Sequence, residues 1–305
     1  MTYEQAIQMV GNTPHVRVNG KSSAASLYVK LEGCNPTGSI KDRTCVRLLQ
    51  DALDRGELKP GMCLLDASSG NLGCALAYYA RLFGYETFVV SSSKLTAAKK
   101  EFMEFYGAKV HLVGSFTIEG NNFCRAMAEE NPGRYCFLDQ LHNWGNPKAH
   151  YETTAPEILN AFPDLALVVG SLGSGGSLLG TAQYIKEHAP RIRVVAVQAA
   201  IGTRLPGTAS LEEGDYVTPF IDKGFRDKLF DETFKVTEAE ATAGALRLRD
   251  QGIFCGLQTG GVLHAAEQVV EDQRIRGKVI VLSGDSGWKN LDKLLFAHRA
   301  SGCKN

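Results

Sequence analysis

The chain has 305 residues, 44% of them hydrophobic, with 33 basic and 33 acidic side chains and therefore a formal net charge of zero. At this length two domains of about 100–200 residues each are expected, and the balanced charge argues against a nucleic acid or an anionic membrane as partner. No apolar run approaches the roughly 20 residues that span a bilayer and no secretory signal is visible, so we expect a soluble, cytoplasmic protein.

Short apolar runs alternate with amphipathic stretches along almost the whole chain. Continuous Val and Leu content, as in residues 165–169, is typical of strands buried on both faces of a parallel sheet. The repeated strand–helix–strand order predicts an α/β protein with open, twisted, mostly parallel sheets. The predicted strands are residues 27–31, 63–66, 87–91, 109–113, 165–169, 193–197 and 279–282, and the predicted helices are residues 42–55, 71–83, 96–106, 147–161, 178–188 and 239–250.

Glycine-rich turns directly follow two of these strands, at residues 68–73 and 170–176. In open α/β sheets ligands bind at the carboxyl ends of the strands, where such turns lie. The least periodic stretch, residues 202–228, is expected to be a long irregular connection, either functional or a simple surface insertion.

The cysteines and the common catalytic motifs exclude several classes of protein. None of the eight cysteines forms a Cys-x-x-Cys pair, so a structural zinc site is not indicated and we expect no bound metal. Several cysteines, such as Cys63, lie in apolar runs, which favours buried, reduced core thiols over disulfides. Neither His-Glu-x-x-His nor Gly-x-Ser-x-Gly occurs, so nothing supports a metalloprotease or an α/β-hydrolase.

A glycine-rich segment, Gly-Ser-Gly-Gly-Ser-Leu-Leu-Gly at residues 173–180, stands between a predicted strand and a predicted helix. Unpaired amides at a helix start favour an anion, and the hydroxyl groups of Ser174 and Ser177 add donors. Leu178 occupies the place where a dinucleotide fingerprint needs glycine, and no Gly-Lys-Ser/Thr follows. The segment therefore predicts a site for a phosphate monoester, with a purely structural turn as the alternative.

Lys41 stands at the head of a predicted helix, after the turn Asn-Pro-Thr-Gly at residues 35–38. The amino end of a helix repels cations, so a lysine at this place is electrostatically poor. A lysine with a depressed pKa offers a neutral amine that can form a Schiff base. Lys41 is therefore a candidate for covalent chemistry, and the alternative is a solvated lysine at the start of a surface helix.

Three motifs in this order resemble the pyridoxal-phosphate-dependent cysteine synthase family of fold-type II, which is related to the tryptophan synthase β chain. They are the Lys41 loop, Ser-Ser-Gly-Asn at residues 68–71 and the glycine segment 173–180. The resemblance implies two α/β domains with pyridoxal 5′-phosphate in the cleft between them, and a homodimer. Residues 1–34 with 146–305 would form the larger, phosphate-binding domain, and residues 35–145 the smaller, mobile one. Further matches that extend the resemblance over nearly the whole chain are residues 11–14, 150–157 and 285–287.

The resemblance assigns a role to each matching residue. Lys41 would hold the cofactor as an internal aldimine and later move the α-proton of the substrate. Asn71 would hydrogen-bond the 3′-hydroxyl of the cofactor. Ser68 could instead only cap a helix, and His150 is expected to be a packing residue rather than a base. The remaining assignments are Gly173, Ser174, Gly175, Gly176 and Ser177 for the 5′-phosphate, and Ser68, Ser69, Gly70, Asn71, Leu72 and Gln140 for the amino-acid substrate.

Three departures from the family pattern concern the substrate side of the site. Gln258 takes the place of a serine that faces the pyridine nitrogen, with Thr259 as its neighbour, and either could make this contact. Leu72 replaces a threonine of the asparagine loop, as in relatives that make diaminopropionate precursors. Residues 284–290 and 205–209 differ from the family's Pro-Asp-Ser-Gly-Glu-Arg-Tyr and Gly-Ile-Gly segments.

The resemblance implies β-replacement on O-acetylserine or O-phosphoserine through an aminoacrylate, with sulfide as the nucleophile, as in a cysteine synthase. The departures leave open β-elimination or hydrolysis of L-cysteine with release of sulfide, and replacement by an amine nucleophile as in a diaminopropionate-type synthase. A non-catalytic regulatory relative that only binds the cofactor is a third possibility, against which the intact Lys41, Asn71 and glycine segment argue.

Overall fold

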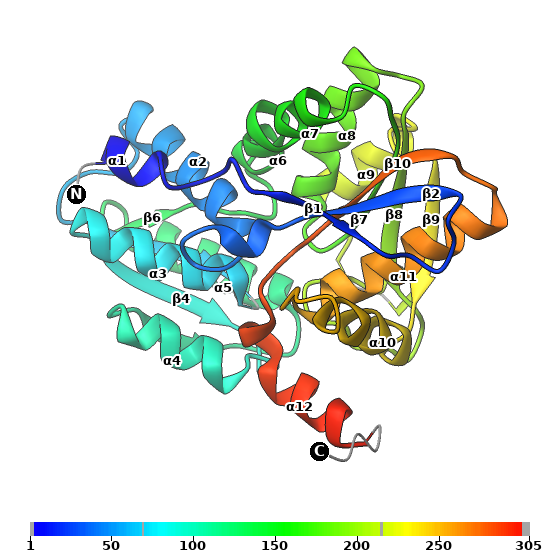
Figure 1. Cartoon of the computed structure of the whole chain (residues 1–305). Helices are drawn as coiled ribbons and strands as arrows, with labels where there is room; N and C mark the ends of the chain where they lie inside the picture. Colours follow the sequence, from blue (N-terminus) through cyan, green and yellow to red (C-terminus); the bar gives the residue numbers. More distant parts are fainter. Residues whose placement is uncertain (1–2, 69, 214–215, 301–305) are drawn as a thin grey trace.

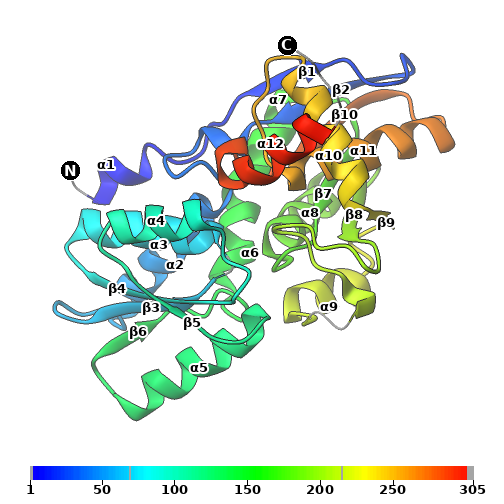
Figure 2. The ribbon, with the colours of Figure 1, turned by 90° about the horizontal axis from the view of Figure 1, so that it is seen from below.

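The computed structural model describes residues 3–68, 70–213 and 216–300. Within these residues the strands form two separate sheets, one of six strands and one of four, which lie beside each other (Figures 1 and 2). None of the described helices is both long enough and apolar enough to cross a bilayer.

The larger sheet has the strand order β1-β2-β10-β7-β8-β9, in which β1 pairs antiparallel with β2 and the other neighbours are parallel. Successive residues of the central strand β7 enter the cores on opposite faces, since Leu167 and Val169 belong to one apolar cluster and Val168 to the other. Burial on both faces explains the continuous apolar run. The strands are β1 His15–Val18, β2 Ala25–Lys30, β7 Leu165–Ser171, β8 Arg193–Ala199, β9 Glu232–Val236 and β10 Gly277–Leu282.

The smaller sheet is entirely parallel, in the order β5-β4-β3-β6. Leu64 of β3 packs in a cluster with residues of α2 and α3, whereas Leu65 packs on the other face with Cys124 of α5. The elements are β3 Cys63–Ala67, β4 Glu86–Ser91, β5 Lys109–Leu112, β6 Tyr135–Phe137, α2 Lys41–Asp54, α3 Asn71–Phe83, α4 Ala97–Phe105 and α5 Thr117–Glu130.

Helices cover both faces of the larger sheet (Figure 1). Helices α10 and α11 bury one face, and α7, α8 and α9 bury the other. The remaining helical elements are α1 Tyr3–Ile7, η1 Glu32–Cys34, α6 Gly145–Ala149, η2 His150–Thr154, α7 Ala155–Ala161, α8 Gly176–His188, η3 Leu211–Glu213, α9 Pro219–Arg226, α10 Glu238–Arg249, α11 Leu257–Asp272, η4 Gly287–Asn290 and α12 Leu291–Ala300.

The expected α/β class with open, mostly parallel sheets is confirmed, but several elements differ from expectation. The helix expected at residues 147–161 is interrupted by the π-helical turn η2, and the stretch expected to be irregular, 202–228, contains α9. Strands β1, β6 and β9 were not expected from the sequence. All three lie at sheet edges, where one side is open and a continuous apolar run is not required.

The cysteine prediction is correct for most of the described thiols. The seven described cysteines are free, and five of them are buried. Cys34, the last residue of η1, is exposed, so the expectation of a core thiol is wrong there, and Cys63 is only half-buried. The eighth, Cys303, lies outside the described residues.

Candidate active site

The Lys41 amine and the glycine segment lie together, although 133 residues separate Lys41 from Ser174. Lys41 is the first residue of α2, and its Nζ donates to Ser174 Oγ at 3.3 Å. Burial lowers the pKa of Lys41 from 10.5 to about 8. A helix start, which disfavours a cation, and removal from water thus both favour the neutral amine that Schiff-base chemistry requires.

The glycine segment forms a tight turn between β7 and α8. Gly175 precedes α8 with a positive φ of 82°, a conformation that glycine adopts at little cost. A Cβ atom added at Gly173 would lie 2.6 Å from the carbonyl oxygen of Gly207, and one added at Gly175 would lie 2.5 Å from the side chain of Ile221. These close neighbours require glycine, and the unpaired amides of the first turn of α8 form a receptor for an anion.

Asn71 is the first residue of α3, and its amide faces the larger sheet. Its Nδ2 donates to Asp285 Oδ2 at 3.0 Å, just beyond the end of β10. Asn71 Oδ1 and Asp285 Oδ1 are both buried and have no hydrogen-bond partner among the described residues. Unpaired buried acceptors are costly, so this place suits a ligand that brings a hydroxyl donor.

The predicted substrate loop at the start of α3 is partly engaged in capping its own helix. Ser68 Oγ accepts from the amides of Gly70, at 3.1 Å, and Gly73, at 2.9 Å. The side chain of Leu72 is buried in the core beside α2, so only its main chain is left for a ligand. Gln140 Nε2 donates to the carbonyl oxygen of Ala67 at the end of β3. Ser69 lies outside the described residues, and the substrate contacts of this loop stay a prediction.

Two of the places where the chain departs from the family pattern meet around the side chain of Gln258. Gln258 Nε2 donates to the carbonyl oxygen of Gly207, and a Cβ atom added at Gly284 would overlap Gln258 Oε1. Glutamine at position 258, which is larger than the serine of the family pattern, therefore fits because residue 284 is a glycine without a side chain. Two of the three departures, Gln258 and the segments that contain Gly207 and Gly284, are therefore coupled in packing, whereas Leu72 lies apart from them in the core beside α2.

Thr259 is the other candidate for the ring-nitrogen contact. It is completely buried, its hydroxyl lies 3.0 Å from Ser283 Oγ, and it accepts from the Gly284 amide at 3.2 Å. Gln258 is 8% exposed. Which of the two would face the ring stays a prediction.

Two buried lysines beside the asparagine loop were missed by the sequence reasoning. Lys99 of α4 is 4% exposed and lies against Gly70, where an added Cβ atom would be 3.0 Å from Lys99 Nζ. Burial lowers the pKa of Lys99, and the charge of Asp285 partly opposes this shift. Lys289 of η4 is completely buried, and its Nζ has no hydrogen-bond partner among the described residues. The amphipathic sequence of α4 predicts a helix whose lysines face the solvent, so it does not indicate that the ammonium group of Lys99 is buried.

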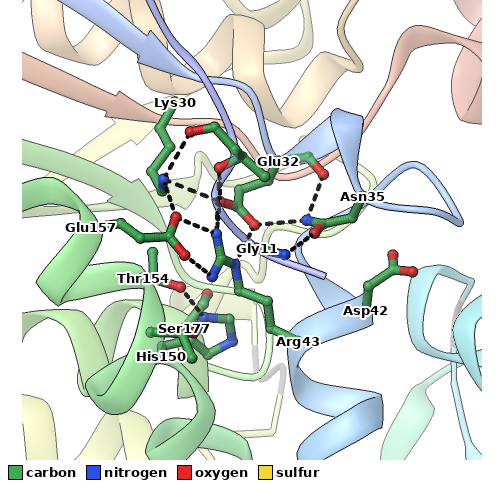
Figure 3. A network of polar contacts seen from close by, with 12 residues as sticks. Gly11, Lys30, Glu32, Asn35, Asp42, Arg43, His150, Thr154, Glu157 and Ser177 are labelled. Atoms are coloured by element: carbon green, nitrogen blue, oxygen red, sulfur yellow. Dashed lines mark hydrogen bonds and ion pairs between the residues drawn. The ribbon is translucent and has the colours of Figure 1, made fainter. Parts of the chain in front are cut away.

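A buried ion network anchors α2 just after Lys41 (Figure 3). The guanidinium group of Arg43 bonds Glu32 at 2.7 and 2.8 Å and Glu157 at 2.7 and 2.8 Å. Lys30 bonds Glu157 at 2.6 Å. Burial alone would raise the pKa of Glu157, but Arg43 and Lys30 lower it to about 2. Because the network joins β2, α2 and α7, it holds the start of α2, and therefore Lys41, in place.

Comparison with known proteins decides which family this site belongs to. Residues 7–284 match the family described as pyridoxal-phosphate dependent enzymes. The chain belongs to this family. It is 37% identical to cysteine synthase B of Pseudomonas aeruginosa, over 86% of this chain and 88% of that protein.

Solved structures of family members support the fold. The structure of O-ureido-L-serine synthase is similar with a TM-score of 0.87 and 30% identity, over 96% of this chain and 94% of that one. A hydrogen sulfide-producing enzyme from Fusobacterium nucleatum is similar with a TM-score of 0.84 and 29% identity, over 93% of this chain and 97% of that one. The expected fold-type II architecture and dependence on pyridoxal phosphate are confirmed.

The residues present fit the family's cofactor. Lys41 offers an amine with a lowered pKa, the glycine segment offers an anion receptor beside it, and Asn71 Oδ1 is an unpaired acceptor for a ring hydroxyl. The described residues contain no cluster of His, Cys, Asp and Glu side chains that could hold a metal ion.

Proposed function

We propose that this pyridoxal-phosphate dependent enzyme catalyses β-replacement on O-acetylserine or O-phosphoserine with sulfide as the nucleophile, as a cysteine synthase does. The observation that carries the proposal is the 3.3 Å contact between Lys41 Nζ and Ser174 Oγ, which brings a reactive amine to an anion receptor. Similarity to proteins named cysteine synthase supports this class of reaction.

The chain's own residues would bind the ligands and move the proton. The bound cofactor would act as an electron sink for the substrate α-carbon. Residues 173–177 would hold its phosphate, Asn71 its ring hydroxyl, and Gln258 or Thr259 its ring nitrogen. Lys41 would hold its aldehyde and, once freed, accept the α-proton, for which a pKa of about 8 is suitable.

The substrate carboxylate would bind at the start of α3. Ser68 Oγ, which accepts from the Gly73 amide, and Gln140 Nε2, which donates to the Ala67 carbonyl oxygen, lie beside this helix start, and Lys99 adds a buried positive charge against Gly70. A helix amino terminus and an ammonium group both favour a carboxylate. Lys99 would therefore contribute to binding of the amino-acid substrate.

We propose that residues 35–145 move as a small domain against a larger domain of residues 1–34 and 146–305. The smaller sheet and its helices lie within the first range. The Arg43 network ties the start of α2 to the larger domain, so the motion would take place about this anchor, and contact between α4 and η4 joins the two domains at another point. Phe102 of α4 stacks on Trp288 of η4 at a centroid distance of 5.4 Å. Closure at this contact would exclude water from the reacting groups. We further propose a homodimeric, cytoplasmic enzyme, as the family resemblance implies.

A second candidate is β-elimination from L-cysteine with release of sulfide. Similarity to a hydrogen sulfide-producing enzyme favours it, together with the absence of a hydroxyl group at residue 72. Similarity to O-ureido-L-serine synthase, whose named product carries its ureido group on oxygen, keeps open a nucleophile other than sulfide.

Product analysis distinguishes these activities. The purified enzyme would be incubated with O-acetylserine or O-phosphoserine, with and without sulfide, and separately with L-cysteine. Cysteine formed from a serine ester and sulfide at a rate above that of sulfide release supports the first proposal, and the reverse order supports the second. Absence of turnover of every substrate by an enzyme that carries the cofactor would contradict both.

A further inference from the structure

A row of hydrogen-bonded side chains runs from the glycine segment into the protein interior. Asn146 Nδ2 donates to Ser174 Oγ at 3.1 Å, and Thr44 Oγ1 donates to Asn146 Oδ1 at 3.2 Å. His150 Nε2 lies 3.1 Å from Thr44 Oγ1, and His150 Nδ1 lies 2.9 Å from Thr154 Oγ1. We call these five residues the Asn146 chain, and four of them, all but Ser174, are completely buried.

Three elements bring the Asn146 chain together. Thr44 lies on α2 one turn after Lys41, Asn146 lies on α6, and His150 and Thr154 begin and end the π-helical turn η2. Figure 3 shows His150 beside Thr154 on this turn. π-Helical turns often occur at functional sites. A Cβ atom added at Gly176 would overlap the Asn146 amide, so the amide also packs on the first residue of α8.

The available donors determine the direction of the hydrogen bonds next to Ser174. Asn146 Nδ2 also donates to the carbonyl oxygen of Gln140 at 2.9 Å, which fixes this atom as the nitrogen and leaves Oδ1 as an acceptor. The single hydroxyl proton of Thr44 therefore goes to Asn146 Oδ1. Thr44 Oγ1 must in turn accept from His150 Nε2.

The protonation state of His150 fixes the direction of the two remaining hydrogen bonds. Burial and then the charges of Lys41 and Arg43 lower the pKa of His150 well below 6.5, so the ring is neutral. A neutral imidazole has one donor and one acceptor nitrogen. With Nε2 donating to Thr44, Nδ1 accepts from the hydroxyl group of Thr154.

This directed row of hydrogen bonds ends at the hydroxyl group of Ser174. Its Oγ accepts from Asn146 Nδ2 at 3.1 Å, from Lys41 Nζ at 3.3 Å and, at the limit of hydrogen-bond length, from the Gly176 amide at 3.5 Å. Neither the Asn146 amide nitrogen nor the Gly176 amide can accept the Ser174 proton, and the amine of Lys41 is engaged once it holds the cofactor. The proton is therefore left for an external acceptor, and an oxygen of an anion is a suitable one.

We propose that Asn146, Thr44 and His150 are positioning residues that orient the Ser174 hydroxyl as a donor to the cofactor phosphate and as an acceptor for Lys41. The proposal rests on the assignment of the phosphate to residues 173–177. It gives a defined task to three buried residues that lie outside the glycine segment, the Lys41 position and the asparagine loop.

The test compares the dissociation constants of pyridoxal 5′-phosphate and of pyridoxal, which lacks the phosphate, for the purified enzyme and its variants. In Asn146→Asp a carboxylate oxygen would accept the Ser174 proton, so the hydroxyl group would donate to residue 146 and no longer to the phosphate. We expect binding of pyridoxal 5′-phosphate to weaken about tenfold or more, since hydrogen bonds to ionised groups are the strong ones, and binding of pyridoxal to stay unchanged.

Thr44 provides a test with nearly unchanged shape. Thr44→Val removes the donor that fixes the Asn146 amide, and we expect the same selective loss on a smaller scale. Thr44→Ser keeps the hydroxyl group and should restore binding. Thr153→Val is the matched control, because within the described part of the protein the Thr153 hydroxyl bonds only the Ala149 carbonyl oxygen, and Thr153 is not a member of the Asn146 chain.

The outcomes separate this proposal from the assignment of the phosphate. If Ser174→Ala weakens binding of pyridoxal 5′-phosphate but Thr44→Val and Asn146→Asp do not, the positioning role is overturned and the phosphate assignment stands. If Ser174→Ala has no effect, its hydroxyl group does not bind the phosphate and the positioning proposal is overturned, whereas equal affinity of the unaltered enzyme for pyridoxal and pyridoxal 5′-phosphate would refute the phosphate assignment itself. Equal loss for pyridoxal and its phosphate in Thr44→Val would show a general structural role and would also overturn the proposal.

Discussion

Asn71 of the smaller sheet's helix α3 and Asp285 at the end of strand β10 of the larger sheet are joined by a 3.0 Å hydrogen bond from Nδ2 to Oδ2. The second oxygen of each side chain is buried without a partner among the described residues. The bond therefore crosses between the two sheets where unpaired acceptors face a possible ligand, and it orients the amide that we assign to the cofactor hydroxyl.

Asp285→Asn should weaken folding and cofactor binding together. The carboxylate partly compensates the buried charge of Lys99, so its removal leaves that charge less compensated. Asp285 also accepts a hydrogen bond from Asn71, so we expect the free energy of unfolding, determined by urea denaturation, to fall by about 1–3 kcal/mol. The exposed Asp272→Asn on α11, which is not among the charges that act on Lys99, is the control, for which a change below about 1 kcal/mol is expected. Similar small losses in both variants would show that Asp285 carries no such charge role.

Covalent capture of the cofactor should depend on pH through Lys41. Only the neutral amine attacks an aldehyde, so the rate should rise about tenfold per pH unit at low pH. It should level off near pH 8, the value to which burial lowers the pKa of Lys41, and not near 10.5. Borohydride reduction followed by peptide mapping measures the capture, and Lys41→Ala should give no label at this position. A label on another lysine, or a rate that still rises at pH 10, would refute the assignment.

Gln258 and Gly284 should behave as one unit. Gly284→Ala places a Cβ atom on Gln258 Oε1 and should lower both stability and cofactor affinity. Gln258→Ser removes the obstacle, so the double variant should recover much of the loss, with a coupling free energy above about 1 kcal/mol. A double-mutant cycle on the free energy of unfolding measures this coupling. Additive effects of the two substitutions would contradict it.

Lys99 should support binding of the substrate carboxylate. Lys99→Met keeps the apolar stem but removes the charge, and we expect KM for O-acetylserine to rise about tenfold, since bonds between ionised groups are strong. Lys100→Met is the matched control, because its ammonium group pairs with Glu104 on the surface of α4. Steady-state kinetics on both variants decide the matter. An unchanged KM in Lys99→Met would remove Lys99 from the substrate site, whatever the fate of the cofactor assignments.

Much of the site was predictable because its key features are local. A lysine at a helix start and glycines between a strand and a helix are encoded within a few residues, as Lys41 and Gly175 show. The α/β class likewise follows from periodicity, since strands buried on both faces need continuous apolar runs. The edge strands β1, β6 and β9 escaped because an open edge relaxes that requirement.

The sequence by itself determined the fold class and indicated the candidate amine and the candidate anion receptor, each through short-range backbone and burial preferences. Only the tertiary structure decided that Gln258 lies between Gly207 and Gly284, that Lys99 is buried against Gly70, and that Asn146 connects Ser174 to Thr44. These relations join segments far apart in the chain. They depend on how whole helices pack. The hydrophobic pattern around a residue shows whether it is buried, but not which distant residue it contacts.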